Sequence, residues 1–347
     1  MNKKLIFLIF IIFIPFYNLA LNISFIDKNT FGGLDKYRSL LIDNNVISAV
    51  FVGDIMLSRY VAESVESTFN GDYDKLFEHI KPFLENRDIV FGNLEGVVTD
   101  QKFRVRGNIV PILQNLRSGL LSLTNVCCRF YTEYEAVASL KNAGFNVVSI
   151  ANNHIGDAGI SGIEDTIYNL ENLQLEYVGG GMNPSDAHRP YIYSKNGINV
   201  CLVAYSNILS SETWEATETR AGISIYDDEK FARDIEQIKD KCDIIIVSLH
   251  FGEEDDSAPD PEEIETTHYI INKGADIIIG HHPHVIQPVE VYNRGLIAYS
   301  LGNFIFDQNS PENSRGLLLE IFIDKDKNVF IVQNNILINY KHQPVLQ

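Results

Sequence analysis

The chain is poor in cysteine and in positive charge, and it has no long apolar run beyond its N-terminal segment. Its 347 residues include four cysteines and no C-x-x-C pair, which excludes a small disulfide scaffold. Lysine and arginine number 28 against 46 acidic residues, and the net charge is −18. Nucleic-acid partners require a basic surface, so the composition argues against them. No G-x-x-x-x-G-K-S/T motif occurs, so any nucleotide activation would need a partner protein.

The four cysteines differ in their surroundings. Cys201 and Cys242 lie within or beside apolar strand patterns, where a small buried thiol is expected. Cys127 and Cys128 are adjacent, and the sequence leaves their state open. An exported protein can form disulfides, but the spacing does not say which cysteines would pair.

The first residues have the pattern of an export signal. Lys3 and Lys4 precede the apolar run from Leu5 to Phe16. The run is short for a membrane span, which needs about 20 apolar residues, and Asn18-Leu19-Ala20 is a poor cleavage site. Residues 1–24 are therefore predicted to be a signal peptide or an uncleaved signal anchor, and the absence of a nearby cysteine excludes a lipoprotein. Either way, the charge pattern places the rest of the chain outside the cytoplasm.

The remaining sequence divides into a lead-in and one domain. Residues 25–45 show no clear periodicity and predict a linker. From Val46, short apolar runs alternate with amphipathic segments, which indicates α/β layers, and hairpin signals such as Asn196-Gly197 make the sheets mixed. We expect one domain over residues 46–340, without internal repeats. Strands are expected at 47–52, 88–91, 146–150, 198–204, 243–249 and 276–280, and helices at 73–85, 134–143, 163–172, 227–242 and 261–273.

Polar side chains follow five of the expected strands at the point where each strand ends. They are Asp54, Glu95, Asn153 with His154, His250, and His282 with His284. Ligands of α/β sheets collect where parallel strands end, and imidazole is the commonest protein ligand for metals. Carboxylates can bridge two cations, while imidazole and amide groups complete their shells. The set therefore predicts a site for one or two divalent metal ions of the kind that hydrolases use.

Single members of this set have simpler explanations. Taken alone, Asp54 favours a helix cap, and His250 favours a buried core histidine. Glu95 and Asn153 are equally well explained as turn residues. Only the tip from His282 to His284, stiffened by the proline between them, favours a functional role without the others. The prediction therefore depends on the combination.

The motifs that carry these residues follow one another in a recognisable order. They are Gly53–Leu57, Gly92–Gly96, Ala151–His154 with Asp157, His250–Glu253, Gly280–Val285, and Tyr299–Phe304 with Asp307. The set covers roughly residues 48–308 and resembles the CapA family of poly-γ-glutamate capsule synthesis proteins. That family is similar to the calcineurin-like metallophosphoesterases. The resemblance implies an α/β fold, a four-layer α/β/β/α sandwich of mixed sheets, with a two-metal site.

The resemblance also implies roles for individual residues. Glu95 would bridge two ions, Asp54 and His284 would hold the first, and Asn153, His250 and His282 would hold the second. His154 and Asp157 would be the catalytic residues, with His154 protonating a leaving group. Asn303 and Asp307 would orient histidines. Mn²⁺ is the expected ion, with Mg²⁺, Zn²⁺ and Fe²⁺ as alternatives. Met56 stands where phosphoesterases carry a histidine, and a thioether is a weak ligand for such ions.

Two functions follow from the resemblance. The first is an exported, membrane-associated protein of capsule polymer synthesis or export, with a metal-dependent hydrolase site that cleaves a phosphoester or an amide. Its partners would be an anionic polymer or peptide-like substrate and other capsule proteins. The second is a non-catalytic polymer-binding or export component with a degenerate metal site, which Met56 and the signal anchor favour. The run Glu253–Asp256 makes one wall of the site acidic, where a polyanion would be repelled.

Overall fold

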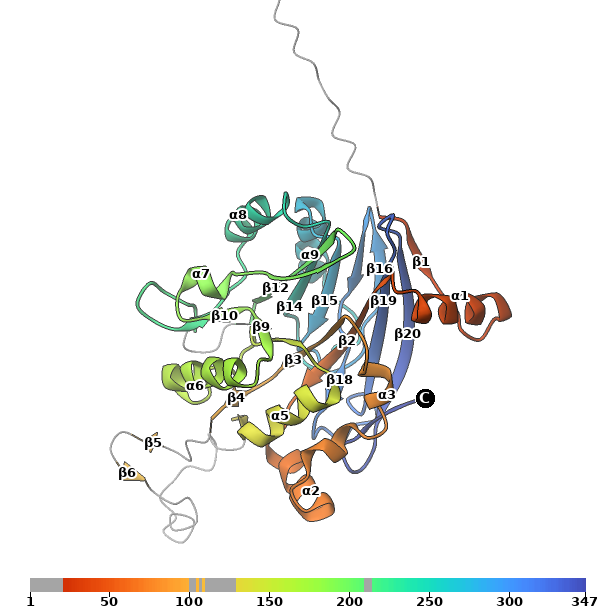
Figure 1. Cartoon of the computed structure of the whole chain (residues 1–347). Coiled ribbons are helices and arrows are strands. Elements are labelled where there is room, and N and C mark those ends of the chain that lie inside the picture. Colours follow the sequence, from red (N-terminus) through yellow and green to blue (C-terminus); the bar gives the residue numbers. More distant parts are fainter. Residues whose placement is uncertain (1–20, 100–103, 106–107, 110–128, 209–213) are drawn as a thin grey trace, which may run out of the picture.

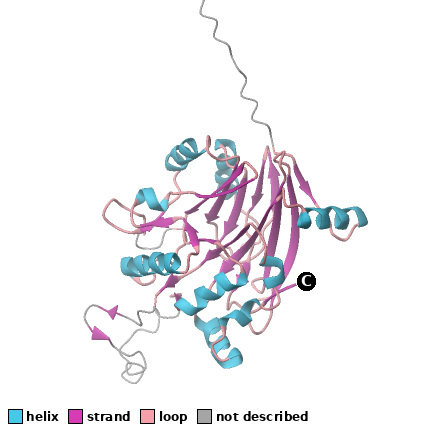
Figure 2. Cartoon of the chain, in the orientation of Figure 1, coloured by secondary structure: helices cyan, strands magenta, loops and turns pink. Residues whose placement is uncertain are grey.

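Two large β-sheets stack face to face, and helices cover the outer face of each (Figure 1). The computed structural model describes residues 21–99, 104–105, 108–109, 129–208 and 214–347. Figure 2 shows the strands gathered in the centre and the helices around them. Most of the predicted signal segment, and the pair Cys127 and Cys128, lie outside the described residues. Within the described part, no helix is both long and apolar enough to cross a membrane.

The first sheet is mixed. Its described strands follow the order β1-β20-β19-β2-β3-β8-β9, with β18 paired to β2 and β21 to β20. Strands β2, β3, β8 and β9 are parallel, whereas β19 is antiparallel to both β2 and β20. The bounds are β1 (Ile23–Phe25), β2 (Ile47–Ile55), β3 (Ile89–Leu94), β8 (Val147–Ser149), β9 (Glu176–Val178), β18 (Asn303–Ile305), β19 (Arg315–Ile323), β20 (Val329–Ile338) and β21 (Pro344–Leu346).

The second sheet is also mixed, with the order β11-β12-β14-β15-β17-β16. Its four inner strands are parallel, and the edge strands β11 and β16 pair antiparallel with their hairpin partners. The turn between β11 and β12 has positive φ at Asn196 and Gly197, which confirms the predicted Asn-Gly hairpin. The bounds are β11 (Tyr191–Lys195), β12 (Ile198–Ser206), β14 (Ile244–His250), β15 (Ile277–His281), β16 (Val289–Tyr292) and β17 (Gly295–Ala298).

Helices and short strand pairs complete the described fold. The helices are α1 (Phe31–Ile42), α2 (Arg59–Phe69), the 3-10 helix η1 (Tyr73–Phe77), α3 (Lys81–Leu84), α5 (Tyr134–Ala143), α6 (Gly159–Asn172), α7 (Pro184–Ala187), α8 (Asp228–Ile238) and α9 (Pro261–Lys273). The short strands are β4 (Val97–Val98) with β7 (Tyr131–Thr132), β5 (Arg104–Val105) with β6 (Asn108–Ile109), and β10 (Gly180–Gly181) with β13 (Gly222–Ile223).

Alternating side chains divide the core into three apolar layers. On β2, Phe51 faces the second sheet, whereas Val50 faces the helices α2, α5 and α6. On β14, Ile246 faces the first sheet, and Val247 packs toward α8 and α9. Successive strand residues point to opposite faces, so strands with apolar residues on both faces must be covered on both sides. The predicted four-layer α/β/β/α sandwich of mixed sheets is thereby confirmed.

The lead-in differs from the linker predicted for residues 25–45. Strand β1 pairs parallel with β20, and Thr30 caps α1 by accepting a hydrogen bond from the backbone N–H of Gly33 (3.1 Å). Leu40 is buried against the outer surface of the first sheet, and the Tyr37 hydroxyl donates to the buried carboxylate of Glu320. Only one side chain of α1 is buried, so its apolar periodicity is weak and the sequence pattern does not reveal it.

The helix predicted for residues 73–85 is interrupted. The structure has η1 over Tyr73–Phe77 and then the separate helix α3, with Pro82 in its first turn. Proline lacks a backbone N–H and cannot continue a preceding helix, but it fits the first turn of a new one. The apolar side chains of Leu76, Ile80 and Leu84 are all buried.

Cys201 and Cys242 form a disulfide, which overturns the expectation of two buried thiols. Cys201 lies in β12, and Cys242 comes just before β14, the strand that pairs with β12. Their Cα atoms are 5.7 Å apart, which suits a disulfide. Strand adjacency brings the two cysteines together, and the sequence alone does not state that adjacency.

Candidate metal centre

The predicted donors gather where parallel strands of both sheets end. Asp54 lies near the end of β2, Glu95 comes directly after β3, and His250 is the last residue of β14. The tip with His282 and His284 follows β15. Both sheets therefore contribute to one place, because their parallel strands end on the same side of the sandwich.

Asp54, Glu95 and His250 form a compact buried group. One donor atom from each lies within 4.8 Å of the other two, and their side chains are at most 1% exposed. Asn93 donates to Oδ1 of Asp54 (2.8 Å), and the backbone N–H of His282 donates to Oδ2 (3.1 Å). These contacts hold the Asp54 carboxylate in one orientation.

A second group joins His282 and His284 to Glu254, again with donor atoms within 4.8 Å. His284 connects the two groups, since its Nε2 lies 3.8 Å from Oε1 of Glu95 and its Nδ1 lies 3.4 Å from Oδ2 of Asp54. Nδ1 is also 2.9 Å from Oδ1 of Asn303. The two groups are therefore halves of one centre.

Asn153 and His154 approach the same centre. The Asn153 side chain lies 2.9 Å from Nε2 of His250. Nε2 of His154 lies 3.8 Å from Oε1 of Glu95, while its Nδ1 lies 3.0 Å from the Asp157 carboxylate. Phe130 stacks on the His154 ring with 3.8 Å between the ring centroids. Asp157 and Phe130 thus hold His154 with one nitrogen toward the centre.

Asp307 does not orient a histidine, contrary to the expectation. Its carboxylate is bound at two points by the Arg59 guanidinium, at 3.0 and 2.8 Å, and by the backbone N–H of Tyr60. Arg59 in turn lies over the Phe130 ring, 5.1 Å from its centroid. Asp307 therefore supports the start of α2 and the wall beside His154.

Burial and close charges shift the pKa values of the centre in opposite directions. Burial raises the pKa of Glu95 to about 7 and lowers that of His282 to about 4. Burial also disfavours charge on His284, but the carboxylates of Glu95 and Asp54 outweigh it and raise the His284 pKa to about 10. Burial opposes ionisation of Asp54 too, yet the rings of His281 and His284 hold its pKa well below the usual range.

Unpaired buried atoms show that these side chains fit a cation. Oε1 of Glu95 and Nδ1 of His282 are buried and have no hydrogen-bond partner among the described residues. Leaving a buried polar atom unpaired costs about 1–3 kcal/mol, so such atoms call for an explanation. A divalent ion takes carboxylate oxygen and imidazole nitrogen as ligands, and both atom types converge here.

Comparison with known proteins places the chain in a family. The sequence profile of the bacterial capsule synthesis protein PGA_cap matches residues 48–308. The chain belongs to this capsule synthesis family. It is 34% identical over 284 residues to the PGA biosynthesis protein CapA of Bacillus subtilis, covering 82% of the chain and 69% of that relative. It is also 34% identical over 281 residues to the capsule biosynthesis protein CapA of Bacillus anthracis, covering 80% of the chain and 64% of that relative.

Structural similarity to a solved protein is weaker. The NAD nucleotidase of Haemophilus influenzae superposes with a TM-score of 0.42 and 13% identity, over 87% of this chain and 53% of the nucleotidase. The capsule synthesis family, rather than this superposition, is therefore the relationship that bears on function.

Three side chains of this family member lie in the centre although the sequence did not single them out. His281 is fully buried, with Nδ1 3.3 Å from Asp54, and Asn93 bonds the same carboxylate. Glu254 belongs to the second donor group. His281 and Asn93 stand inside the recognised motifs, so their position beside a predicted ligand was the available signal. Glu254 belongs to the run Glu253–Asp256, which the sequence placed in a wall of the site, but the pattern does not tell which of the four acids reaches the donors.

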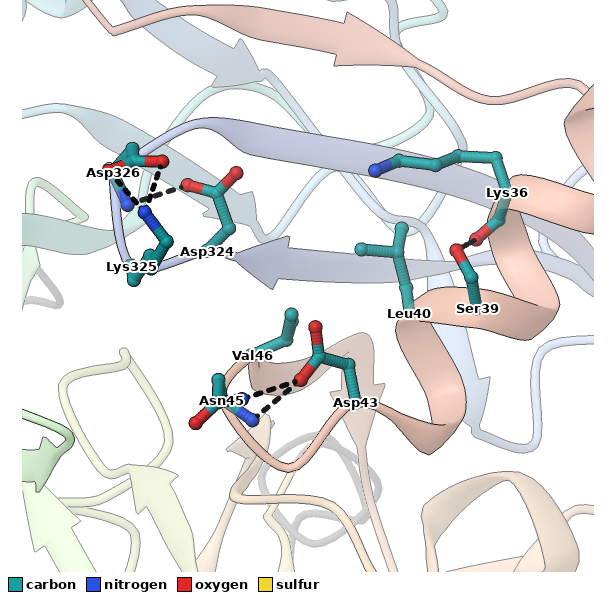
Figure 3. A pocket seen from close by; sticks show the side chains of 9 residues that line it. All are labelled: Lys36, Ser39, Leu40, Asp43, Asn45, Val46, Asp324, Lys325 and Asp326. Atoms are coloured by element: carbon teal, nitrogen blue, oxygen red, sulfur yellow. Dashed lines mark hydrogen bonds and ion pairs between the residues drawn. The ribbon is translucent and has the colours of Figure 1, made fainter.

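A surface hollow lies outside the matched region, between α1 and the turn that joins β19 to β20. It measures about 240 Å³ and is lined by Lys36, Ser39, Leu40, Asp43, Asn45, Val46, Asp324, Lys325 and Asp326 (Figure 3). Two of its carboxylates accept hydrogen bonds from the backbone of the turns that follow them. Asp43 accepts from the N–H of Asn45, and Asp324 accepts from the N–H of Asp326. No predicted metal ligand lines this hollow, so the strand-end centre remains the candidate site.

Proposed function

We propose that this protein takes part in the synthesis or export of a poly-γ-glutamate-type capsule polymer and carries a metal-dependent hydrolase site. Membership of the capsule synthesis family supports the first part. One observation carries the second: Asp54, Glu95 and His250 converge within 4.8 Å in a fully buried group. Three such donors are costly to bury together without a cation, because each loses its hydration. The substrate class is an amide-linked acidic polymer or a phosphoester.

In this proposal the ligands divide between one or two ions. Asp54 and His284 hold the first, Asn153, His250 and His282 hold the second, and Glu95 lies between them. Mn²⁺ is the proposed ion, with Mg²⁺, Zn²⁺ and Fe²⁺ as alternatives, because the donors are oxygen and imidazole nitrogen. A divalent ion in such a site supplies Lewis acidity and lowers the pKa of bound water.

His154 is the proposed proton donor. Its Nδ1 is engaged by Asp157 at 3.0 Å, which leaves Nε2 facing Glu95. The stack with Phe130 prevents the ring from turning away. In its imidazolium form His154 carries a proton on Nε2 that can pass to a leaving amine or alkoxide in the centre, which leaves the neutral ring. The Asp157 carboxylate accepts from Nδ1–H in both forms, stabilises the charged ring and keeps its orientation.

The proposed location is the outer face of the cell membrane. The N-terminal segment either anchors the chain there or is removed, and other capsule synthesis or export proteins are the proposed partners. A nucleic-acid partner is not proposed, because the net charge of −18 would repel phosphates.

A non-catalytic polymer-binding role is the second candidate, and Met56 favours it. The Met56 side chain is fully buried in the apolar layer beneath the helices. Its sulfur accepts hydrogen bonds from the N–H and the hydroxyl of Ser58, at 3.2 and 3.0 Å. The position that holds a histidine in phosphoesterases is thus occupied by a side chain turned to the core, which would weaken one metal site.

A paired binding and turnover experiment separates the two candidates. The full-length chain is freed of metal, loaded with Mn²⁺, and assayed on γ-glutamyl peptides and on bis(p-nitrophenyl) phosphate. We expect binding and turnover in the wild type and neither in the double variant His282→Ala/His284→Ala. His268→Ala is the matched control, because His268 stacks on Tyr292 outside the centre.

The outcomes are distinct. Mn²⁺ binding without turnover of either substrate class would favour the polymer-binding role. Full turnover in the double variant would contradict the proposed hydrolase site.

A further inference from the structure

The acidic loop after β14 is fastened to the histidine tip. The backbone N–H of Asp255 donates to the carbonyl of Pro283 (2.9 Å), and Gln287 donates to the carbonyl of Asp256 (2.8 Å). Asp255 adopts a positive φ of 67°, which turns the loop toward the tip. Asn313 then binds the Asp255 carboxylate (2.8 Å). Four neighbouring carboxylates repel one another, and these contacts hold the loop beside the tip against that repulsion.

Glu254 is the member of this run that reaches the donors. A carboxylate oxygen of Glu254 lies within 4.8 Å of a ring nitrogen of both His282 and His284. Its negative charge also contributes to the raised pKa of Glu95, which places it near the first donor group. The Asp255 carboxylate is occupied by Asn313, and Asp256 contributes its backbone carbonyl.

A second observation concerns His282, which lies opposite Glu254 in this group. His282 is only 6% exposed, and its Nδ1 has no hydrogen-bond partner among the described residues. An exposed carboxylate beside a buried, unpaired imidazole leaves a gap with donors on both sides. A cation fills such a gap, because both atom types are ligands for divalent ions.

We propose that Glu254 is a metal ligand, adding a carboxylate to an ion that His282 and His284 also bind. This inference rests on the proposed metal site and extends it by one residue. It supplies a donor to a centre in which Met56 is turned into the core and contributes none. The affinity for the ion then depends on a loop that is ordered by its contacts to the tip.

Mn²⁺ binding by two neighbouring glutamine variants tests the proposal. The full-length wild type, Glu254→Gln and Glu253→Gln are made metal-free and titrated with Mn²⁺ by calorimetry, and the bound ion is examined by electron paramagnetic resonance. We expect Glu254→Gln to lower the affinity at least about tenfold, since even residues that only support a metal ligand have effects of that size. Glu253→Gln removes the same charge from the adjacent residue and should stay within about twofold, because salt screens surface charges.

Three results would overturn the proposal. Equal affinity in the wild type and Glu254→Gln would remove Glu254 from the ligands and leave the metal site standing. Equal losses in both variants would indicate attraction by the acidic loop as a whole. A wild type that binds no divalent ion would overturn this inference together with the proposed metal site. An altered resonance spectrum confined to Glu254→Gln would support direct coordination.

Discussion

Burial and neighbouring charges decide which side chains of the centre are protonated. Glu95 is fully buried and keeps one oxygen unpaired, so burial raises its pKa to about 7. His284 is nearly as buried, but two carboxylates beside it favour its charged form. A proton on His284 therefore balances the negative charge of Asp54 when no cation is present. A metal ion entering the centre must displace that proton.

Mn²⁺ binding should release protons and strengthen as the pH rises. The pKa of His284 is raised to about 10, so its ring is protonated at pH 7 to 8 and must lose the proton to bind a metal. Affinity should increase about tenfold per pH unit for each proton displaced. Titration calorimetry in buffers of different ionisation enthalpy, between pH 6.5 and 8.5, measures the number released. Unchanged affinity over this interval would contradict the assignment of His284 as a ligand.

At the scale of elements, neighbouring strands are joined by more than their hydrogen bonds. Strands β12 and β14 pair in parallel over seven residues from Val200 to Ser206. The disulfide between Cys201 and Cys242 links the same two strands near the start of β14. His250 lies at the other end of β14. The link therefore stabilises the strand that delivers one of the donors.

Removal of the disulfide should cost stability without moving the donors. Its two cysteines are 41 residues apart in sequence, and the loop-closure relation gives a loss of about 4 kcal/mol for a loop of that size. Urea unfolding of Cys201→Ala/Cys242→Ala against the oxidised wild type measures it. Reduced and alkylated wild type should unfold at the lower midpoint as well. Identical midpoints for the oxidised wild type and the variant would refute a stabilising bond.

At the scale of the whole molecule, one carboxylate joins the two sheets. Asp88 precedes β3 in the first sheet and accepts from the N–H and the hydroxyl of Ser48 at 2.8 and 3.1 Å. It also accepts from Lys195 (2.8 Å) and from the Tyr193 hydroxyl, both on β11 of the second sheet. Burial opposes its charge, but these donors lower its pKa below the usual value. The side chain is 14% exposed.

Asp88→Asn should destabilise the protein at neutral pH and much less in acid. A carboxyl whose pKa is lowered by folding adds stability above its unfolded pKa, about 3.9, and loses it as the pH falls through the folded value. We expect a loss of about 1–3 kcal/mol at pH 7, typical of a buried charged hydrogen-bond network. Urea unfolding at pH 7 and at pH 3 measures the difference. An equal loss at both values would show that charge on Asp88 plays no part.

Much of the fold could be predicted from local pattern. The apolar runs ending at Phe91, Leu249 and Ile279 form buried strands, and the Asn196-Gly197 hairpin is present. The errors have local causes as well. Pro82 interrupts the helix expected over 73–85, and α1 buries too few side chains to show a period.

The centre was only partly predictable for a different reason. Asp54, Glu95 and His250 stand at strand ends, where polar residues among apolar ones are conspicuous. His281 stands in the motif Gly280–Val285 but was given no role there, and Glu254 stands among similar acids. Asp307 was expected beside a histidine but binds Arg59 instead. Such partners depend on side chains from distant segments, which a motif does not record.

The sequence by itself determined the layered α/β class, the positions of most strands and the polar residues at their ends, because each is a property of one segment and its side-chain period. Only the tertiary structure decided which strands are neighbours. That choice pairs Cys201 with Cys242, docks β1 and α1 on the first sheet, and brings Glu254 to the histidine tip. The physical reason is that packing of the two sheets, not any single segment, fixes which distant residues share a buried space.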